Sequence, residues 1–398
     1  MSVVLDLSNT AHCRSATGVQ RVARQVNAAL AETGAEPVAV VWDPYAKRWR
    51  APGTRELALL APAAAETPGT SRSEVWTLGQ KLRGLLRWGG EPDWDKLRGT
   101  TLLAPEIFSA EVFPNYPSLR AKLGGPAAAL FYDAVAMRFP ALTPPGNVAR
   151  VEGYLRELAS FDGVTTISEA SRADLLEQWA RLGVREMAPV EAIPLGVTPP
   201  TTPVPPPRAD NDRVGAMILS VGSIEGRKNH LALLEAAETL WREGRHFRLI
   251  LAGLPRPETA AAALRLAAAL QSAGRPLQMA GPVGDRRLEE LYARCRFTVY
   301  PSLYEGFGLP VAESLLRSRP CICGTGGALA EVAPGGGCLV VPEPSAAYLA
   351  AALRSLLDDD ALHARLCTEA AHRQFPTWAD YARRLTTWLA TLPRRTLA

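Results

Sequence analysis

At 398 residues the chain is longer than one ordinary folding core, so two or three domains are expected, and we favour two. Hydrophobic residues make up 47% and charged residues 21%, a balance that excludes an intrinsically disordered chain. A net charge of +4 is too small by itself to indicate nucleic-acid binding, although it suits anionic substrates or an anionic lipid surface.

The N-terminus and the cysteines predict the compartment. The first ten residues, MSVVLDLSNT, have no basic start and no long apolar core, so neither a signal peptide nor a membrane anchor is expected. Nowhere do about 18 uncharged apolar residues follow one another. The six cysteines are spread along the chain, three of them in apolar runs, as is typical of reduced core thiols. We therefore expect a soluble, cytoplasmic protein.

The N-terminal stretch has the pattern of a strand, a loop and a helix. An apolar run from Val3 to Leu5 is followed by a polar loop containing Thr17 and Gly18. Apolar residues then recur at helical spacing from Val19 to Leu30. A glycine at this point is a weak signal for a ligand site, because it also marks an ordinary helix start.

Residues 38–42 predict a second strand, whereas residues 50–99 are rich in Ala, Pro and Trp and predict no clear element. Within them, Lys81 to Trp88 alternates basic and apolar residues in an amphipathic pattern. Such a segment can dip into a membrane surface. An ordinary surface helix with its aliphatic side chains turned inward gives the same pattern, and more often.

The next strands are expected at 101–104 and 127–132, and the second ends in Tyr132 and Asp133. Ligands of open α/β sheets gather at the carboxyl ends of strands, which makes Asp133 a candidate site residue. The aspartate can equally begin a loop or cap a helix. A strand at 163–167 and a helix follow, and then six prolines between Pro199 and Pro207 indicate a semi-rigid linker. We place the domain boundary near residue 205.

The second half repeats the alternation of strands and helices. Strands are expected at 217–221, 248–252, 277–280, 297–300, 321–323 and 338–341, with helices between most of them. This alternation indicates a doubly wound parallel sheet. A final amphipathic helix is expected from Trp378 to Leu392.

A pair of cations follows the first strand of this half. After Val221 the chain runs through Gly222 to Asn229, and Arg227 and Lys228 stand at the start of the next helix. Two adjacent cations there oppose the helix dipole, which makes sense if an anion lies between them. A pair of exposed loop cations is the alternative.

The most informative stretch runs from Val299 to Cys323. After a short strand, the chain passes through the glycine loop E-G-F-G-L, from Glu305 to Leu309, and becomes helical. The glycines let backbone amides approach a ligand, and the N-terminus of a helix favours an anion. Glu305 and Glu313 then place two carboxylates beside that anion, where they can bind sugar hydroxyls. Alternatively, both glutamates are solvated or cap the helix.

The nine residues E-G-F-G-L-P-V-A-E resemble the E-x7-E motif of family 4 retaining glycosyltransferases. The resemblance implies the α/β GT-B fold, with two Rossmann-like domains facing a central cleft and a C-terminal helix that returns to the N-terminal domain. We accordingly assign residues 1–205 to the acceptor-side domain, 206–375 to the donor domain and 376–398 to the closing helix. It also implies that Glu305 holds the donor sugar and Glu313 the ribose of a nucleotide sugar.

Further segments resemble the same family. T-G-V-Q-R around Gly18 is similar to a T-G-I/V-Q-R segment of a bacterial subgroup, whose first loop faces the donor diphosphate. The step from Tyr132 to Asp133 is similar to the Y/H-D step of that subgroup, although the histidine of many relatives is Tyr132 here. The R-K step of the family binds the donor pyrophosphate. The turn at residues 324–327, with Glu331, resembles a family turn near the donor only in part.

The resemblance also implies which residues form the site. Catalytic roles are expected for Glu305, Asp133, Lys228 and Arg227. The donor site is expected to comprise Gly18, Arg227, Lys228, Val283, Glu305, Gly306, Phe307, Gly308, Leu309 and Glu313. Val283 enters because A-G-P-V-G resembles the loop that packs on the nucleobase through backbone groups.

No metal and no cofactor is expected beside the nucleotide sugar. The two D-x-D-like segments, Asp93 to Asp95 and Asp358 to Asp360, do not follow apolar strands, and the histidines show no metal-ligand spacing. A nicotinamide enzyme would need G-x-G-x-x-G after the first strand, and this is missing. A phosphorylase or epimerase of the same fold, and an inactive nucleotide-sugar binding protein, remain alternatives.

The expected reaction is the transfer of a hexosyl group, with retention, to a hydroxyl of a glycan or lipid-linked glycan in bacterial surface polysaccharide synthesis. GDP-mannose is the favoured donor from the subgroup resemblance, while UDP-sugars, GDP-fucose and dTDP-rhamnose stay open. Peripheral contact with the cytoplasmic face of the inner membrane is a further expectation, and no nucleic-acid partner is expected.

Overall fold

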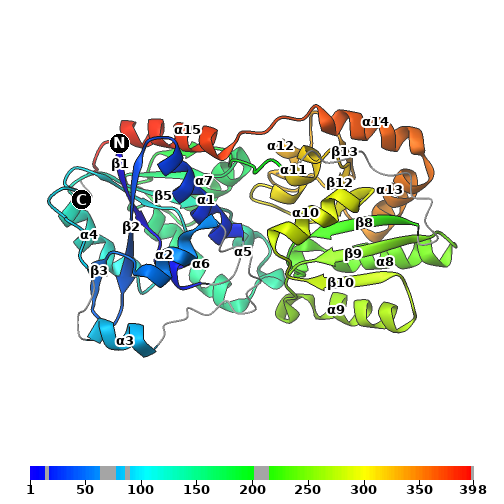
Figure 1. The fold of residues 1–398 in the computed structure, drawn as a ribbon, viewed down its shortest axis with the longest axis horizontal. Helices are drawn as coiled ribbons and strands as arrows, with labels where there is room; N and C mark the ends of the chain where they lie inside the picture. Colours follow the sequence, from blue (N-terminus) through cyan, green and yellow to red (C-terminus); the bar gives the residue numbers. More distant parts are fainter. Residues whose placement is uncertain (14–17, 63–77, 86–89, 201–214, 396–398) are drawn as a thin grey trace. The chain divides into compact units, whose positions relative to one another are not determined.

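The computed structural model describes residues 1–13, 18–62, 78–85, 90–200 and 215–395. They form two compact units (Figure 1). The first unit comprises residues 1–134, 150–196 and 376–398, and the second comprises 135–149 and 197–375. The position near residue 205, where the sequence predicts a domain boundary, lies outside the described residues.

The first unit is built on one sheet. Its main elements are β1 (Ser2–Asp6), α1 (Gly18–Glu32), β2 (Glu36–Asp43), β3 (Arg48–Arg50), α2 (Thr54–Leu60), α3 (Leu78–Leu85), β4 (Thr101–Ala104), α4 (Tyr116–Leu123), β5 (Ala127–Phe131), most of α6 (Pro145–Leu158), β6 (Gly163–Thr166), α7 (Glu169–Arg181), β7 (Val190–Ala192) and α15 (Trp378–Thr391). The strand order is β3-β2-β1-β4-β5-β6-β7, and only the pairing of β2 with β3 is antiparallel among the described strands. The central strands are continuous apolar runs, as expected for parallel strands covered on both faces.

The C-terminal helix α15 belongs to the first unit, where it packs against α1 (Figure 1). Glycine permits this approach at the start of β6, because a Cβ at Gly163 would lie 2.7 Å from Leu392 and 2.9 Å from Trp388. The return of the last helix to the N-terminal domain, which the family resemblance implies, is therefore confirmed.

The second unit repeats the plan. Its main elements are α5 (Val135–Arg138), η4 (Pro140–Leu142), β8 (Ala216–Val221), η5 (Gly226–Lys228), α8 (His230–Arg242), β9 (Phe247–Ala252), α9 (Pro257–Ser272), β10 (Leu277–Gly281), α10 (Asp285–Arg294), β11 (Phe297–Tyr300), α11 (Leu309–Leu316), β12 (Cys321–Cys323), α12 (Leu329–Val332), β13 (Cys338–Val340), α13 (Ala346–Asp358) and α14 (Asp360–Ala371). The strands pair in parallel in the order β10-β9-β8-β11-β12-β13.

Alternate residues of these strands enter two separate cores. On β8, Ile218 packs with side chains of α8, α9 and α13, whereas Met217 and Leu219 pack with side chains of α10. On β9, Leu249 and Leu251 face the first core and Ile250 the second. Helices thus cover both faces of the sheet, which confirms the doubly wound arrangement.

For residues 81–88 the sequence leaves two interpretations, a segment that contacts a membrane surface and an ordinary surface helix. Helix α3 ends at Leu85, and residues 86–88 lie outside the described part of the chain. Leu78 and Leu82 of α3 are 74% and 50% exposed, so these two aliphatic side chains do not turn inward as in an ordinary surface helix. Lys81 lies with its Nζ 5.8 Å from the ring centroid of Tyr45.

Candidate active site

The carboxyl ends of β8 and β11 are neighbours at the point where the strand order of the second sheet reverses. The chain proceeds from β8 toward β9 and β10 on one side, and from β11 toward β12 and β13 on the other. Loops that leave two such strands diverge, and ligands of doubly wound sheets bind between them. The loops at 222–229 and 301–308 are therefore where a site in this unit is expected.

Both loops contribute to a cluster around Glu305, whose side chain is buried. Its Oε1 accepts hydrogen bonds from Arg227 Nη1 at 2.9 Å and from Lys228 Nζ at 2.5 Å, and Ser302 Oγ donates to the same oxygen. Arg227 Nη2 also lies 3.0 Å from Glu225 Oε1. The sequence predicts an anion between the two cations, and in this structure the Glu305 carboxylate takes that position.

Burial and charge act in opposite directions on this cluster. Burial alone would raise the pKa of Glu305, but the positive charges of Arg227 and Lys228 outweigh it and lower the pKa to about 2. Burial lowers the pKa of Lys228, against the opposing effect of Glu305. The ammonium group also donates to the hydroxyl of Tyr300 and lies 4.7 Å from its ring centroid. Glu305 is therefore ionised at neutral pH, and its charge counteracts the effect of burial on the pKa of Lys228.

The loop of Glu305 is braced by the turn at residues 324–327. Glu305 N donates to Gly326 O at 3.2 Å. A Cβ at Gly326 would lie 1.9 Å from Leu303 O, and one at Gly327 would lie 2.4 Å from Glu305 O, so the two backbones approach as only glycine allows. This turn, which resembles a family turn near the donor, thus directly contacts the Glu305 loop.

Gly308 begins helix α11 with a φ of +96°, a conformation that favours glycine. Pro310 stands in the first turn, where its missing N–H costs no hydrogen bond. The residues expected to offer their amides at this N-terminus are mostly buried: Gly306, Phe307 and Gly308 are buried and Leu309 is half-buried. The helix dipole gives the N-terminus of α11 a partial positive charge, which lies beside the loop.

Glu313 lies in the second turn of α11 and is only 4% exposed. Its Oε2 accepts a hydrogen bond from the hydroxyl of Tyr292, on α10, at 3.2 Å. The carboxylate is thus held by the protein itself, which the sequence pattern does not predict.

Val283 lies in the turn between β10 and α10 and is half-buried. Its side chain packs against the core that contains Met217, Leu219 and Leu291. Because the Val283 side chain faces the core, a ligand at this turn would contact its backbone groups and not this side chain.

The short segment that contains α5 and η4 packs on both loops of the site. Leu142 lies against Gly226, since a Cβ on that glycine would be 3.0 Å from Leu142 Cδ2. The ring centroid of Phe139 is 6.1 Å from that of Tyr304, and the Arg138 guanidinium is 5.0 Å from the same ring. The sequence analysis assigns residues 135–149 to the N-terminal domain, whereas these contacts group them with the second unit.

Two expected site residues belong to the first unit. Gly18 is exposed and is the first residue of α1, while Thr17 before it lies outside the described residues. Asp133 is half-buried after β5, and it adds to the effect of burial in raising the pKa of Tyr154. The side chain of the preceding Tyr132 is buried, and its hydroxyl donates to Pro105 O at 2.6 Å.

Several residues of these sites are missing from the sequence analysis. Ser302 follows directly after a strand, the same signal that indicates Asp133, and Glu225 stands two residues before Arg227. In the first unit, Asp6 and Glu106 end or follow β1 and β4 and are almost completely buried. Their positions after apolar strands mark them, but no pattern in the sequence shows that they are neighbours.

Within the described residues, no group of three or more histidine, cysteine, aspartate or glutamate side chains has a metal-binding arrangement. The two D-x-D-like segments serve other contacts. Asp93 pairs with Lys96, Asp358 with Arg245, and Asp359 caps helix α14. The same part of the chain contains no helix long and apolar enough to cross a bilayer.

Comparison with known proteins identifies relatives of both halves. Residues 209–373 match the model of the family described as Glycosyl transferases group 1. The chain is 30% identical over 237 residues to O-antigen chain mannosyltransferase B from Escherichia coli, covering 58% of this chain and 62% of that protein. It is 26% identical over 344 residues to the Escherichia coli serotype-specific mannosyltransferase WbdA, covering 80% of this chain and 38% of the relative. The chain thus spans less than two thirds of either relative.

Solved structures share the fold over nearly the whole chain. Sucrose-phosphate synthase from Thermosynechococcus elongatus superposes with a TM-score of 0.67 at 19% identity, covering 98% of this chain and 99% of that one. At this identity the similarity concerns the fold alone. The fold is GT-B, as the sequence resemblance predicts.

Proposed function

Because residues 209–373 belong to the glycosyl transferases group 1 family, we propose that this protein is a retaining glycosyltransferase that moves a hexosyl group from a nucleotide sugar to a hydroxyl group. The observation that supports this most is the cluster at the strand switch point, where Arg227 and Lys228 share one oxygen of Glu305. Cations at this position suit a diphosphate, and the carboxylate between them suits a sugar.

The cluster suggests an exchange of partners when the donor binds. The donor diphosphate pairs with Arg227, Lys228 and the amides at the start of α11, and the Glu305 carboxylate turns to the sugar hydroxyls. The departing diphosphate gains negative charge as the bond between the sugar C1 and its phosphate oxygen breaks. Cations and helix dipole fixed at that point stabilise the charge where it develops.

We propose a front-face substitution. The acceptor oxygen bonds to C1 on the side from which the diphosphate leaves, through an oxocarbenium-like state, and the acceptor proton passes to the departing phosphate oxygen. Configuration at C1 is then retained. No carboxylate of this chain needs to bond covalently to the sugar in this route, and Glu305 acts by binding hydroxyls as the ring distorts.

GDP-mannose is the donor that we propose first. The two Escherichia coli relatives are named mannosyltransferases, and one is named for the O-antigen chain, which supports mannose and a bacterial surface polysaccharide. Glu313 would bind the ribose and the turn at Val283 the base. UDP-sugars, GDP-fucose and dTDP-rhamnose are the alternative donors.

Two other functions would use the same fold. A phosphorylase or epimerase would release sugar phosphate or free sugar, and an inactive relative would bind the nucleotide sugar without turnover. The four charged residues of the donor site, Arg227, Lys228, Glu305 and Glu313, are all present and buried or partly buried, which favours the transferase.

For the acceptor we propose a glycan or lipid-linked glycan at the cytoplasmic face of the inner membrane. The exposed Leu78 and Leu82 on α3, beside Lys81, suit peripheral contact with a lipid surface.

A donor screen tests the proposal. The purified protein is incubated with GDP-mannose, UDP-glucose, GDP-fucose or dTDP-rhamnose, with and without a lipid-linked glycan, and the released nucleoside diphosphate is measured. We expect release with GDP-mannose that increases when the glycan is added, and an α-linked product by NMR. Release of sugar phosphate instead would indicate a phosphorylase, and binding of every donor without turnover would indicate an inactive protein.

A further inference from the structure

The Lys228 ammonium group is held by two side chains, and the proposed reaction treats them differently. Nζ donates to Glu305 Oε1 at 2.5 Å and also to the hydroxyl of Tyr300. In the proposed exchange of partners the Glu305 carboxylate turns to the sugar, so it does not stay with the ammonium group. Tyr300 is then the protein partner that remains.

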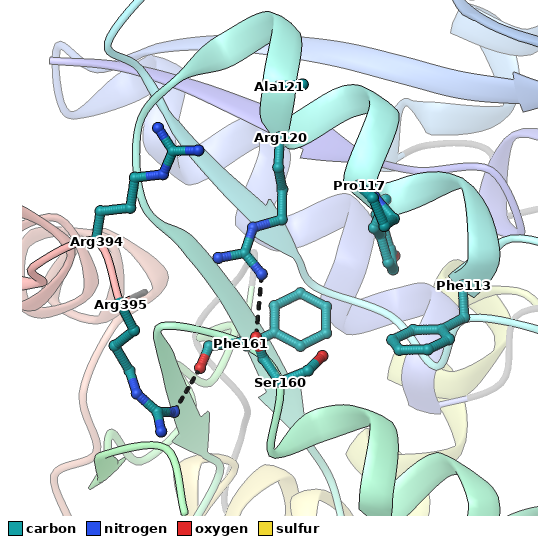
Figure 2. Close-up of a pocket in the computed structure, with 9 residues that line it drawn as sticks. Phe113, Pro117, Arg120, Ala121, Ser160, Phe161, Arg394 and Arg395 are labelled. Carbon is teal, nitrogen blue, oxygen red and sulfur yellow. Dashed lines mark hydrogen bonds between the residues drawn. The ribbon is translucent and has the colours of Figure 1, made fainter. Parts of the chain in front are cut away.

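Two half-buried arginines of the first unit give a contrast. Arg120 and Arg395 line a cavity of about 650 Å³ (Figure 2). Their Nη1 atoms donate to Ser160 O and Phe161 O, each at 3.0 Å. Such carbonyl groups belong to the backbone and keep their places when side chains reorient. Lys228 Nζ donates to side chains instead, so its position depends on how firmly the remaining one is fixed.

Tyr300 is fixed by its place in the sheet. It is the last residue of β11 and is 3% exposed. Because β11 pairs with β8 on one side and with β12 on the other, the backbone that carries this ring is held on both sides. The tyrosine hydroxyl is therefore a rigid acceptor at the carboxyl end of the strand.

The Tyr300 ring also contacts the lysine. Nζ of Lys228 is 4.7 Å from the ring centroid, within the range of a cation–π interaction. A Cβ at Gly222 would lie 3.8 Å from Tyr300 Cε2 and 3.9 Å from Lys228 Cε, so the ring and the lysine stem border the same glycine. Both the ring and the hydroxyl thus restrict where the ammonium group can lie.

The Tyr300 hydroxyl stays protonated. Burial raises its pKa well above the ordinary value, and the charge of Glu305 adds to this effect. The neutral hydroxyl accepts the ammonium N–H through an oxygen lone pair. Because burial already lowers the pKa of Lys228, loss of this acceptor would lower it further.

We propose that Tyr300 is a positioning residue for the donor diphosphate, whose hydroxyl and ring hold the Lys228 ammonium group in place while its other partner changes from Glu305 to the diphosphate. This inference rests on the proposed function. Ser302 acts on the other side of the exchange, because its hydroxyl donates to Glu305 and not to the lysine.

The pH dependence of diphosphate binding can report on this role, because of the groups that face Lys228. Glu305 has a pKa of about 2 and His230 of about 3, so the first is ionised and the second neutral from pH 7 to pH 9. Arg227 keeps its charge, since a guanidinium group has a pKa above 12. Glu225 adds negative charge that favours the ammonium form. Within this cluster, Lys228 is therefore the cation whose charge can change in this range.

Isothermal titration calorimetry with GDP and with UDP, at pH 7 and pH 9, tests the role of Tyr300. The whole protein is compared with Tyr300→Phe, which keeps the ring and loses the hydroxyl. We expect Tyr300→Phe to weaken binding of the preferred nucleotide about two- to fivefold at pH 7, and about tenfold or more at pH 9. The ratio of the two dissociation constants cancels the titration of the nucleotide itself.

Two further variants locate the effect. Lys228→Gln has no ammonium group at either pH, so Tyr300→Phe should approach its affinity at pH 9. Tyr381→Phe is the matched control, because Tyr381 is a buried tyrosine of the first unit whose hydroxyl has no hydrogen-bond partner among the described residues. It should bind like the wild type at both pH values, and thermal unfolding checks that each variant is folded.

The outcomes separate this inference from the proposed function. If folded Tyr300→Phe weakens binding by the same factor at pH 7 and pH 9, or not at all, Tyr300 only packs in the core and the inference is overturned alone. If the wild type binds neither nucleotide, the proposed function is overturned and this inference with it.

Discussion

Glu106 and Glu305 occupy equivalent positions in the two sheets, yet their carboxyl groups differ in charge. Each follows the strand beside the first strand of its sheet, β4 next to β1 and β11 next to β8. Each is buried, with 2% and 7% of the residue exposed. Burial raises the pKa of Glu106 to about 8, and Asp6 adds to the effect, whereas Arg227 and Lys228 overcome burial and lower the pKa of Glu305 to about 2.

The loop after the first strand of each sheet causes the difference. In the first unit the described residues of that loop offer neutral donors to Glu106, which accepts hydrogen bonds from Asn9 N at 2.5 Å and Thr10 N at 2.9 Å. No lysine or arginine of the described residues lies within 4.0 Å of its carboxylate. In the second unit the loop supplies Arg227 and Lys228. One topology thus places the carboxylate, and the groups around it decide whether it is neutral or ionised.

The largest expected effect comes from neutralising Glu305. Glu305→Gln should lower kcat about hundredfold or more, because it removes a charged hydrogen-bond acceptor from the sugar as the ring distorts, and contacts that strengthen in the transition state act on kcat. Steady-state kinetics with saturating donor measures this. Lys228 would also lose its closest carboxylate, so a lower unfolding temperature is expected.

The matched control is Glu258→Gln, an exposed glutamate at the start of α9. It should leave kcat within about twofold of the wild type, a difference below 1 kcal/mol. If Glu305→Gln behaves like this control while remaining folded, the sugar-binding role of Glu305 is wrong.

The next effect concerns Glu106 and the pH dependence of stability. Its folded pKa of about 8 lies above its reference value of 4.5, so the folded state holds a proton that the unfolded state releases between these values. Stability therefore decreases as pH rises from about 4.5 to 8. Each pKa unit corresponds to about 1.4 kcal/mol, so the difference between 4.5 and about 8 corresponds to a loss of up to about 5 kcal/mol.

Urea unfolding at pH 5 and pH 9 measures this, and Glu106→Gln is the comparison. The variant keeps a neutral side chain at all pH values, so the difference between the two pH values should shrink. It should not vanish, because burial also raises the pKa of Asp6. Identical pH profiles for both proteins would contradict a neutral Glu106.

Local patterns predicted much of the fold and the family. The strand expected at residues 297–300 and the helix expected from Leu309 agree with β11 and α11, because glycine and proline mark these boundaries. The nine-residue motif lies within residues 209–373, which match the model of the family described as Glycosyl transferases group 1. Residues 145–158 form a helix that the sequence analysis did not predict, and residues 54–60 and 78–85 form helices within the stretch that showed no clear pattern.

The sequence could not predict which side chains meet. Glu305 and Arg227 are far apart in the chain, and their contact follows from the pairing of β8 with β11. The same holds for Asp6 and Glu106, which have no family motif to mark them. Residues 135–142 read as a continuation of the first domain, but Leu142 and Phe139 pack on the loops of the second unit because tertiary contacts decide their place.

A smaller effect is expected at Glu313. If its carboxylate binds ribose hydroxyls, which change little during the reaction, Glu313→Gln removes binding equally from ground and transition states. The donor KM should rise roughly tenfold with kcat largely kept, as for one charged hydrogen bond. Tyr292→Phe is the control, because it removes the hydrogen bond at 3.2 Å to Glu313 without changing the carboxylate charge. A KM change in Tyr292→Phe as large as in Glu313→Gln would point to a packing role.

The smallest expected effect is that of chelation. Divalent metals in other glycosyl-transfer sites neutralise the leaving diphosphate, and here Arg227, Lys228 and the N-terminus of α11 are placed to do so. In the proposed reaction the diphosphate replaces Glu305 as their partner, and the two cations then oppose its charge directly. We therefore expect turnover in excess EDTA to stay within about twofold of the untreated rate, a barrier change of less than about 0.5 kcal/mol. The measurement is nucleoside diphosphate release after dialysis against EDTA, with added manganese or magnesium as the comparison. Complete loss of turnover in EDTA, restored by either metal, would show that the two cations do not neutralise the diphosphate by themselves. The loop that carries Arg227 and Lys228 would then act together with a divalent metal.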